Sequence, residues 1–294
     1  MTPHRWWLPN LGSFWMLVAT FCFAIMGAFV KIGAEKFTSP ELVFYRSAFG
    51  LLAISFYIFP NRLPLKTPYL GKQMGRAWVG FISLVLFFYA IAHLPLATAI
   101  TLNYTSPLFL AALMPFMLKD ELHPKQTKRL LHFALLLGFI GVILLLQPTF
   151  TRKDILAGSL GLLSGAGAGL AYAHVKQLGQ LNEPDWRTVF YFTLVSTIGG
   201  TVWMLLHRFT PIIWQDLPIL IGLGVSATIA QLALTRAYRT GNTLIVASLA
   251  YTTVIFASLI GYFYWHEALL PNEIFAICLI ILGGMLSVFT TRNN

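Results

Sequence analysis

Residues 98–120 read TAITLNYTSPLFLAALMPFMLKD, and the second half of the chain repeats their pattern 147 residues later. TLNYTS at 101–106 aligns with SLAYTT at 248–253, so both copies follow [ST]-L-x-Y-T-[ST], and the same offset pairs Asp120 with Glu267. Polar residues are costly inside an apolar membrane helix, so their agreement weighs more than agreement among aliphatic residues. The repeat divides the chain into two units, which we expect at 1–148 and 149–294.

The composition is that of a membrane protein. Of 294 residues, 57% are hydrophobic and only 10% are charged, whereas a soluble domain carries about 25% charged residues. The formal net charge is +10. It does not indicate nucleic-acid binding, because Lys and Arg lie between apolar segments rather than on one basic face. The first apolar run, 13–34, is too long for the core of a signal peptide and is expected to be a membrane span.

The spacing of apolar runs predicts ten membrane helices. A span needs about 20 apolar residues, and backbone groups in lipid must hydrogen-bond within their own segment. The predicted spans are 13–34, 41–59, 76–93, 96–118, 129–147, 155–176, 187–207, 215–235, 244–265 and 271–290.

The distribution of Lys and Arg predicts that both termini are cytoplasmic. With that orientation, 14 Lys and Arg residues fall on the cytoplasmic side and 5 on the other side. Five helices per unit is an odd number, so the second unit enters the membrane inverted relative to the first. Inverted repeats are typical of transporters.

The chain resembles the EamA-type branch of the drug/metabolite transporter superfamily over nearly its whole length. The resemblance rests on FYRS at 44–47, LPLA at 94–97, YTSPLF at 104–109, and a helix-end acid followed four residues later by Pro in both units. The family usually has Glu where this chain has Asp120. The resemblance implies an all-α membrane protein of ten helices in two inverted five-helix repeats, a central cavity, and export of small metabolites.

Two matching polar faces are the first candidates for substrate binding. Thr101, Tyr104 and Thr105 lie at i, i+3 and i+4, hence on one helical face. Their counterparts in the second unit are Ser248, Tyr251 and Thr252. These faces should avoid lipid. They either line a cavity or join helices through hydrogen bonds, and we expect the two tyrosines to flank the cavity.

Proline should distort the helix predicted at 96–118. Pro107 cannot donate to the carbonyl of Asn103, and such freed carbonyls are tolerated where they meet protein or a wet cavity. Asn103 is therefore a candidate substrate contact beside a kink. The segment 244–265 has no matching proline, so we expect the two units to move differently. We assign Pro107, Asp120 and Glu267 structural or gating roles.

Arg46 is the one Lys or Arg well inside a predicted span, which makes it a functional candidate. It could bind a substrate carboxylate. We favour a structural role, because it lies about one turn from the helix end and could pair with Glu41 or Glu267.

Other polar and aromatic residues complete the candidates. Gln231 is a candidate substrate contact, and His174 is interpreted as packing or gating rather than as a proton relay. Trp15, Tyr89 and Tyr172 would face the cavity if the family architecture holds. The stripe Gly161, Gly165, Gly169 is interpreted as a surface that lets another backbone approach closely.

We therefore expect a multi-pass inner-membrane secondary transporter that exports a small organic metabolite, such as an amino acid or amphiphile. No cofactor, metal ion or catalytic residue is expected, and the partners are the substrate and the lipid bilayer, with a homodimer left open. A membrane-embedded enzyme would need catalytic constellations such as HExxH or GxSxG, which are absent from the sequence. A scaffold would usually bring a soluble domain or long loops.

Overall fold

The computed structural model describes residues 11–117, 133, 136–138, 140, 141, 144, 152–207, 209–241, 246, 249–267 and 269–292. Within these residues the secondary structure is helical, with no strand. The elements are α1 Leu11–Gly33, α2 Ser39–Ile58, α3 Leu70–His93, α4 Leu96–Asn103, α5 Ser106–Met117, α7 Arg152–Gln180, α8 Asp185–Leu206, η2 Trp214–Asp216, α9 Leu217–Thr240, α11 Thr252–Trp265 and α12 Pro271–Arg292.

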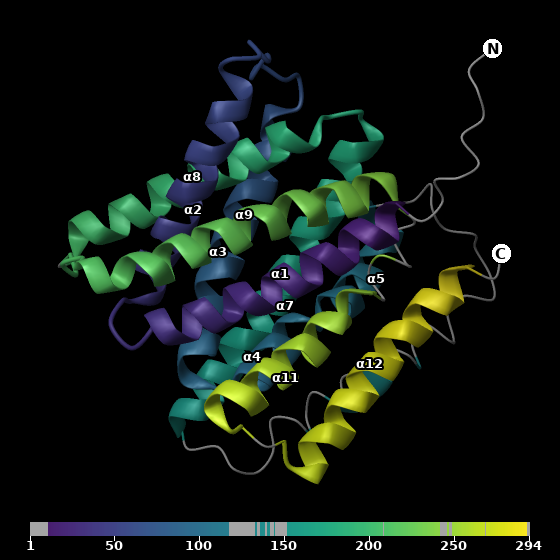
Figure 1. Cartoon of the computed structure of the whole chain (residues 1–294). Coiled ribbons are helices and arrows are strands. Elements are labelled where there is room, and N and C mark those ends of the chain that lie inside the picture. The colour runs from purple at the N-terminus through teal and green to yellow at the C-terminus, as the bar shows by residue number, and fades with distance from the viewer. Residues whose placement is uncertain are drawn as a thin grey trace.

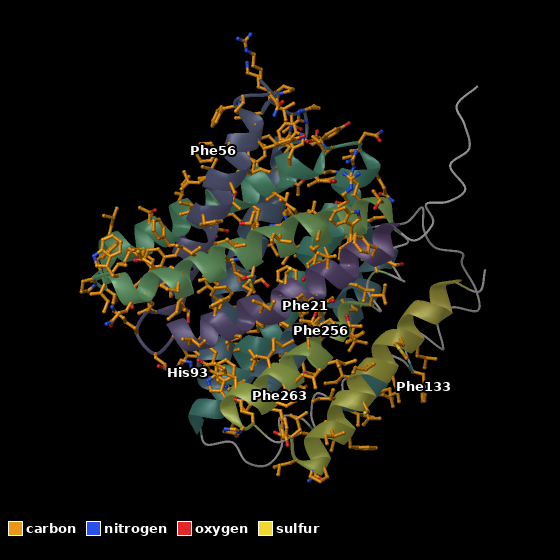
Figure 2. All side chains as sticks on the ribbon, viewed as in Figure 1. Phe21, Phe56, His93, Phe133, Phe256 and Phe263 are labelled. Atoms are coloured by element: carbon orange, nitrogen blue, oxygen red, sulfur yellow. The ribbon has the colours of Figure 1, made fainter. Side chains whose placement is uncertain are left out.

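Six helical segments in this part of the chain are long and apolar enough to cross a membrane, and two shorter apolar helices accompany them. Large hydrophobic side chains cover the outer surface: Phe56 on α2 is 78% exposed and Phe263 on α11 is 73% exposed (Figure 2). Water would disfavour so much exposed apolar surface, whereas lipid accepts it. The protein is therefore a multi-pass membrane protein. Most of the span expected at 129–147 lies outside the described residues, so the count of ten stays a prediction.

Helices from the two halves of the chain pack against one another. In Figure 1, α1 runs beside α9 on one side and α11 on the other. The other extensive pairs are α3 with α7 and α2 with α8. Each of these pairs joins a helix from the first half to one from the second, so neither half has a core of its own among these helices.

Both copies of the repeated motif interrupt a helix at the same tyrosine. The segment expected as one helix at 96–118 is split: α4 ends at Asn103, Tyr104 and Thr105 form a turn, and α5 begins at Ser106. In the second half Leu249 and Ala250 are helical, Tyr251 is a turn residue, and α11 begins at Thr252. The interruption therefore does not require proline, since only the first copy has Pro107.

Two of the differences between the expected and observed helix bounds affect the interior. α3 begins at Leu70 rather than residue 76, which places Arg76 inside the helix instead of at its start. α9 continues to Thr240 rather than ending near 235, which makes Tyr238 a buried residue of that helix. The spans were predicted from apolar runs, and these two helices continue into polar residues beyond the runs.

The glycine stripe of α7 packs closely against the interrupted helix, which confirms the prediction of close backbone approach. A Cβ at Gly165 would lie 2.6 Å from the carbonyl oxygen of Leu102 and 3.0 Å from that of Asn103. A Cβ at Gly169 would lie 2.8 Å from the carbonyl oxygen of Ser106. The stripe thus holds α7 against the segment where α4 gives way to α5.

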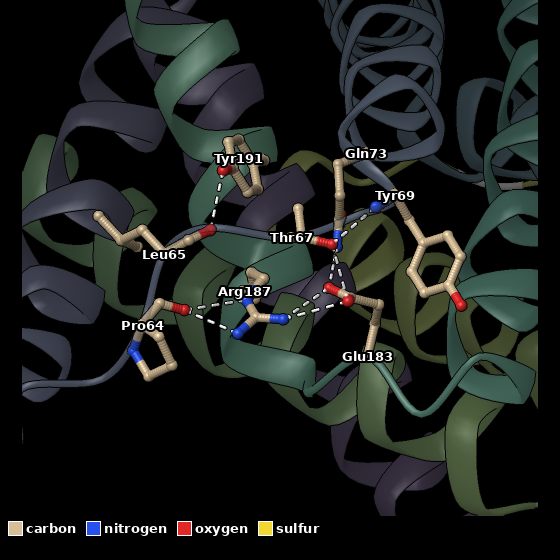
Figure 3. A network of polar contacts seen from close by, with 8 residues as sticks. All are labelled: Pro64, Leu65, Thr67, Tyr69, Gln73, Glu183, Arg187 and Tyr191. Carbon is tan, nitrogen blue, oxygen red and sulfur yellow. Dashed lines mark hydrogen bonds and ion pairs between the residues drawn. The ribbon is translucent and has the colours of Figure 1, made fainter.

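A polar network fastens the α2–α3 connection to the turn between α7 and α8 (Figure 3). The carboxylate of Glu183 accepts hydrogen bonds from Thr67 Oγ1 at 2.8 Å and Gln73 Nε2 at 2.9 Å, and it pairs with Arg187 at 3.0 Å. The same Arg187 donates to the carbonyl of Pro64. Glu183 is therefore the centre of a contact between the two halves at one end of the helix bundle.

Candidate functional site

A central cavity of about 60 Å³ lies between helices of both halves. Its lining is mixed apolar and polar: Phe23, Met26, Arg46, Arg76, Gly80, Ser83, Leu84, Phe87, Asn103, Tyr104, Ala168, Ala171, Tyr172, Phe192, Gln231 and Leu234. Such a volume holds a few water molecules but not a metabolite, because small-molecule sites occupy roughly 300–1,000 Å³. Most of the side chains that line the cavity are buried.

Arg46 lines this cavity, and the expected pair with Glu41 or Glu267 is wrong. Glu41 instead accepts from the backbone N–H groups of Thr38 and Thr210, and Glu267 pairs with Lys31 on α1. The guanidinium of Arg46 is 3% exposed and donates from Nη2 to Gln231 Oε1 at 3.3 Å. Its side chain points into the bundle rather than snorkelling to the surface.

Arg76 is a second cavity arginine, which sequence reasoning missed. It is 3% exposed, and its Cζ lies 3.9 Å from the ring centroid of Phe192, over which Arg46 also lies at 5.2 Å. Arg76 was expected at the start of a span and was counted with the loop cations. The available signal was Gln73, which lies one turn earlier and marks a polar face that continues into the membrane.

Several predicted polar residues do meet at the cavity. Gln231 Nε2 donates to Thr235 Oγ1 at 3.3 Å, which orients its carbonyl oxygen toward Arg46. Asn103 Nδ2 donates to Ser164 Oγ at 2.9 Å. Both amides are thus held by neighbours and exposed to the cavity. Substrate contact by either one stays a prediction.

Two predicted aromatic residues, Tyr104 and Tyr172, also line the cavity. Tyr172 stacks on Tyr238 with ring centroids 5.1 Å apart. Tyr238 is fully buried behind it and was not anticipated. This pair makes the α7–α9 side of the cavity a rigid aromatic wall.

Three hydroxyl residues of the repeated motif, Thr101, Thr105 and Thr252, are engaged in hydrogen bonds outside the cavity lining, and substrate contact by them stays a prediction. Thr101 and Thr105 donate to carbonyls of their own helical segment, those of Ala97 and Leu102, and neither lines the cavity. Thr252 donates to Thr20 Oγ1 at 2.9 Å and so joins α11 to α1. Tyr251 is buried in the core cluster rather than in the cavity lining. Only the contact between Thr252 and Thr20 corresponds to the interpretation as helix-joining residues.

Three further candidates lie away from the cavity. Trp15 lines a separate groove of about 620 Å³ near Tyr57 and Arg236. Tyr89 stacks on His93 with ring centroids 4.1 Å apart. His174 contacts the carbonyl of Leu170 through Nδ1 at 2.9 Å. None of the three belongs to the lining of the central cavity, and their expected roles in binding or gating stay predictions.

Glu267 forms an ion pair with Lys31 and also accepts from the backbone N–H of Leu96 at 3.0 Å. It therefore connects α1, the start of α4 and the end of α11. Pro107 is the second residue of α5, a position that tolerates a missing N–H. Asp120 and Ser248 lie outside the described residues.

Comparison with known proteins agrees with this architecture. The model of the EamA-like transporter family matches residues 10–147 and 155–289. A pseudopaline exporter of Pseudomonas aeruginosa is 29% identical over 96% of this chain and 94% of its own length. A transporter of Helicobacter pylori is 30% identical over 94% of this chain and 93% of its own length.

More distant similarities extend the same picture. A riboflavin transporter of Vibrio cholerae is 27% identical over 78% of this chain and 76% of its own length. One solved crystal structure has the same fold, with a TM-score of 0.69 over 97% of this chain and all of that chain, at 16% identity. The named sequence relatives are membrane transporters of the drug/metabolite transporter superfamily, and this chain belongs to the EamA-like transporter family.

Proposed function

We propose that the protein is an inner-membrane secondary transporter that exports a small organic metabolite by alternating access. The observation that carries the proposal is the central cavity, because its lining comes from α1, α2 and α3 of the first half and from α7, α8 and α9 of the second. Substrate sites of secondary transporters lie near the middle of the bilayer, at the interface between structural repeats. A small cavity lined mostly by buried side chains at that position fits an occluded state between the two open states.

The packing of helices supports the proposal of two inverted repeats. If α7, α8 and α9 are the counterparts of α1, α2 and α3, a two-fold operation converts the α1–α9 contact into the α7–α3 contact. Both contacts are present and extensive, and the α2–α8 contact maps onto itself. The repeat therefore accounts for the packing without further assumptions.

The paired interruptions at Tyr104 and Tyr251 support the same mechanism. Interrupted helices free backbone groups near the centre of the membrane and are common beside transporter binding sites. Here the first interruption places Asn103 and Tyr104 in the cavity lining. We infer that each interrupted helix bends at its tyrosine when its half of the protein opens.

A comparison of metabolites released by cells with and without the protein tests the proposal. We expect at least one small metabolite to accumulate in the medium only when the protein is present. Tyr104→Ala should reduce that release. The matched control is Tyr262→Ala, since Tyr262 is 56% exposed on α11 and lies outside the cavity.

Two outcomes would contradict the proposal. Unchanged metabolite release despite normal membrane levels of the wild type would favour a scaffold or an enzyme. If Tyr104→Ala and Tyr262→Ala reduced metabolite release equally, the central cavity would not be the transport site. The relatives' names include an exporter and a riboflavin transporter, so the solute itself must be inferred from the cavity.

A further inference from the structure

The central cavity contains two cationic side chains on a single aromatic ring. Arg46 extends from α2 and Arg76 from α3, and both guanidinium groups lie over Phe192 of α8, at 5.2 Å and 3.9 Å from its centroid. Each arginine is 3% exposed. Arginine stays protonated in proteins, so the cavity holds two positive charges.

Neither arginine has a carboxylate partner among the described residues. The polar contact of Arg46 is with the neutral amide of Gln231, and its Nε has no hydrogen-bond partner. Arg76 Nε and Nη1 likewise have none. Nearby carboxylates are used elsewhere: Glu41 binds backbone N–H groups, and Glu183 binds Arg187.

This arrangement is costly in the free protein. An unpaired buried charge destabilises the fold, and a cation–π contact with one phenylalanine offsets only part of that cost. Two like charges on the same ring also repel each other. Stability alone would favour methionine or leucine at both positions. Both arginines line the cavity, so an anion that enters it would pair with them and relieve the cost.

We propose that this cavity binds an organic dicarboxylate, with one carboxylate group on Arg46 and the other on Arg76. The proposal rests on the proposed transport function and adds the class of substrate. The guanidinium fork matches a carboxylate through two parallel hydrogen bonds. Asn103, Tyr104 and Tyr172 supply further polar contacts, while Phe23, Met26 and Leu84 suit an apolar body between the two acid groups. The cavity must widen to admit the solute.

Binding can be measured without knowing the natural solute. The purified full-length protein is melted with the straight-chain dicarboxylates from malonate to pimelate at millimolar concentration and constant ionic strength. The diamide of each acid is the neutral control. A ligand that binds only the folded state raises the melting temperature according to its affinity. We expect at least one acid to raise it by several degrees and its diamide to leave it unchanged.

Substitutions assign that binding to the two arginines. Arg46→Gln and Arg76→Gln should each weaken dicarboxylate binding at least tenfold. Arg236→Gln is the matched control, because it removes the same charge from a half-exposed residue paired with Asp185, and it should bind as the wild type does. Arg46→Met and Arg76→Met should raise the melting temperature of the ligand-free protein, because each removes an unpaired buried charge. A structural arginine would give a lower melting temperature instead.

The results that overturn this proposal differ from those that overturn transport. The dicarboxylate site is refuted if no acid is distinguished from its diamide, or if folded Arg46→Gln and Arg76→Gln proteins bind normally. A protein that binds a dicarboxylate but moves nothing across proteoliposome membranes would refute transport and leave the site intact. Transport of neutral or cationic solutes alone would refute the site and leave transport intact.

Discussion

Tyr104 and Tyr251 occupy the same position in two helices 147 residues apart, since each is the turn residue at which a membrane helix is interrupted. Their surroundings differ. Both rings belong to the same buried cluster, at 4% and 3% exposure, but only Tyr104 lines the central cavity. The hydroxyl of Tyr251 has no hydrogen-bond partner among the described residues. The two repeats therefore share the helix interruption at this position, but the two tyrosine rings have different neighbours.

Alanine at these two tyrosines should separate transport from stability. Tyr104→Ala removes a cavity contact worth about 1–3 kcal/mol, so the apparent affinity for the exported solute should fall roughly tenfold. Both rings are buried in the core, so either alanine should cost about 3–5 kcal/mol of folding free energy, but Tyr251→Ala should leave transport per folded molecule unchanged. Solute transport per folded molecule and melting temperature are the two measurements. Equal losses of transport in both variants would place both rings against the solute.

The ion pair between Lys31 and Glu267 should stabilise the end of the bundle where α1, α4 and α11 meet. Both side chains are largely buried, at 17% and 20% exposure, so Glu267→Gln should cost about 1–3 kcal/mol. Exchanging the charges with Lys31→Glu and Glu267→Lys should restore only part of the melting temperature, because lysine cannot accept from the N–H of Leu96. Full restoration would show that the Leu96 hydrogen bond contributes nothing.

Gly165 should tolerate no side chain. A Cβ there would lie 2.4 Å from Thr105 Oγ1 and 2.6 Å from the carbonyl oxygen of Leu102, so Gly165→Ala should cost about 1–3 kcal/mol. Gly71→Ala is the matched control, because no atom lies within 4 Å of its Cβ position. That change should stabilise α3 by about 0.5–1 kcal/mol. The amounts of folded protein and the melting temperatures of both variants test this, and equal behaviour would contradict it.

Acid should weaken the network around Glu183. Burial raises the pKa of the Glu183 carboxyl. Hydrogen bonds from Thr67, Arg187 and Gln73, together with the charge of Arg187, lower the pKa by more than burial raises it. The resulting pKa is below its usual value. A carboxylate with a lowered pKa contributes stability above its unfolded pKa of about 4.3, and this is lost as the pH falls through the folded pKa. At pH values under about 4.5 the melting temperature should therefore decrease as the pH is lowered. Glu183→Gln should make this decrease smaller. The same substitution at exposed Glu35 is the control; a matching reduction there would argue against a role for Glu183.

The orientation can be tested with a reporter that is active only on the periplasmic side. Fusion at Thr151 should be active and fusion at Asn294 inactive, because the excess of Lys and Arg predicts cytoplasmic termini. Both positions lie outside the described residues. The reverse pattern would invert the proposed topology while leaving the fold unchanged.

Helices and family were predictable from the sequence because long apolar runs and repeated polar residues depend on local composition. The partners of polar residues were not. Arg46 was expected to pair with an acid, yet it lies by Gln231, which is 185 residues away. Arg76 was assigned to a helix end because α3 begins a turn and a half earlier than its apolar run. The interruption at Tyr251 could not be predicted from a proline, because the second copy of the motif has none. For both arginines the contact comes from a helix in the other half of the chain.

The cross-chain packing of the cavity also sets an order for its assembly. Arg46 and Arg76 are synthesised more than a hundred residues before Phe192 and Gln231, the groups over which they finally lie. Until α8 and α9 are inserted, we expect each arginine to stay near lipid headgroups or the insertion machinery, because its final neighbours are not yet present. A ribosome stalled before residue 192 should hold a nascent chain whose second and third helices have not settled at their final depth. We therefore expect the cavity to form only after α8 and α9 have been inserted.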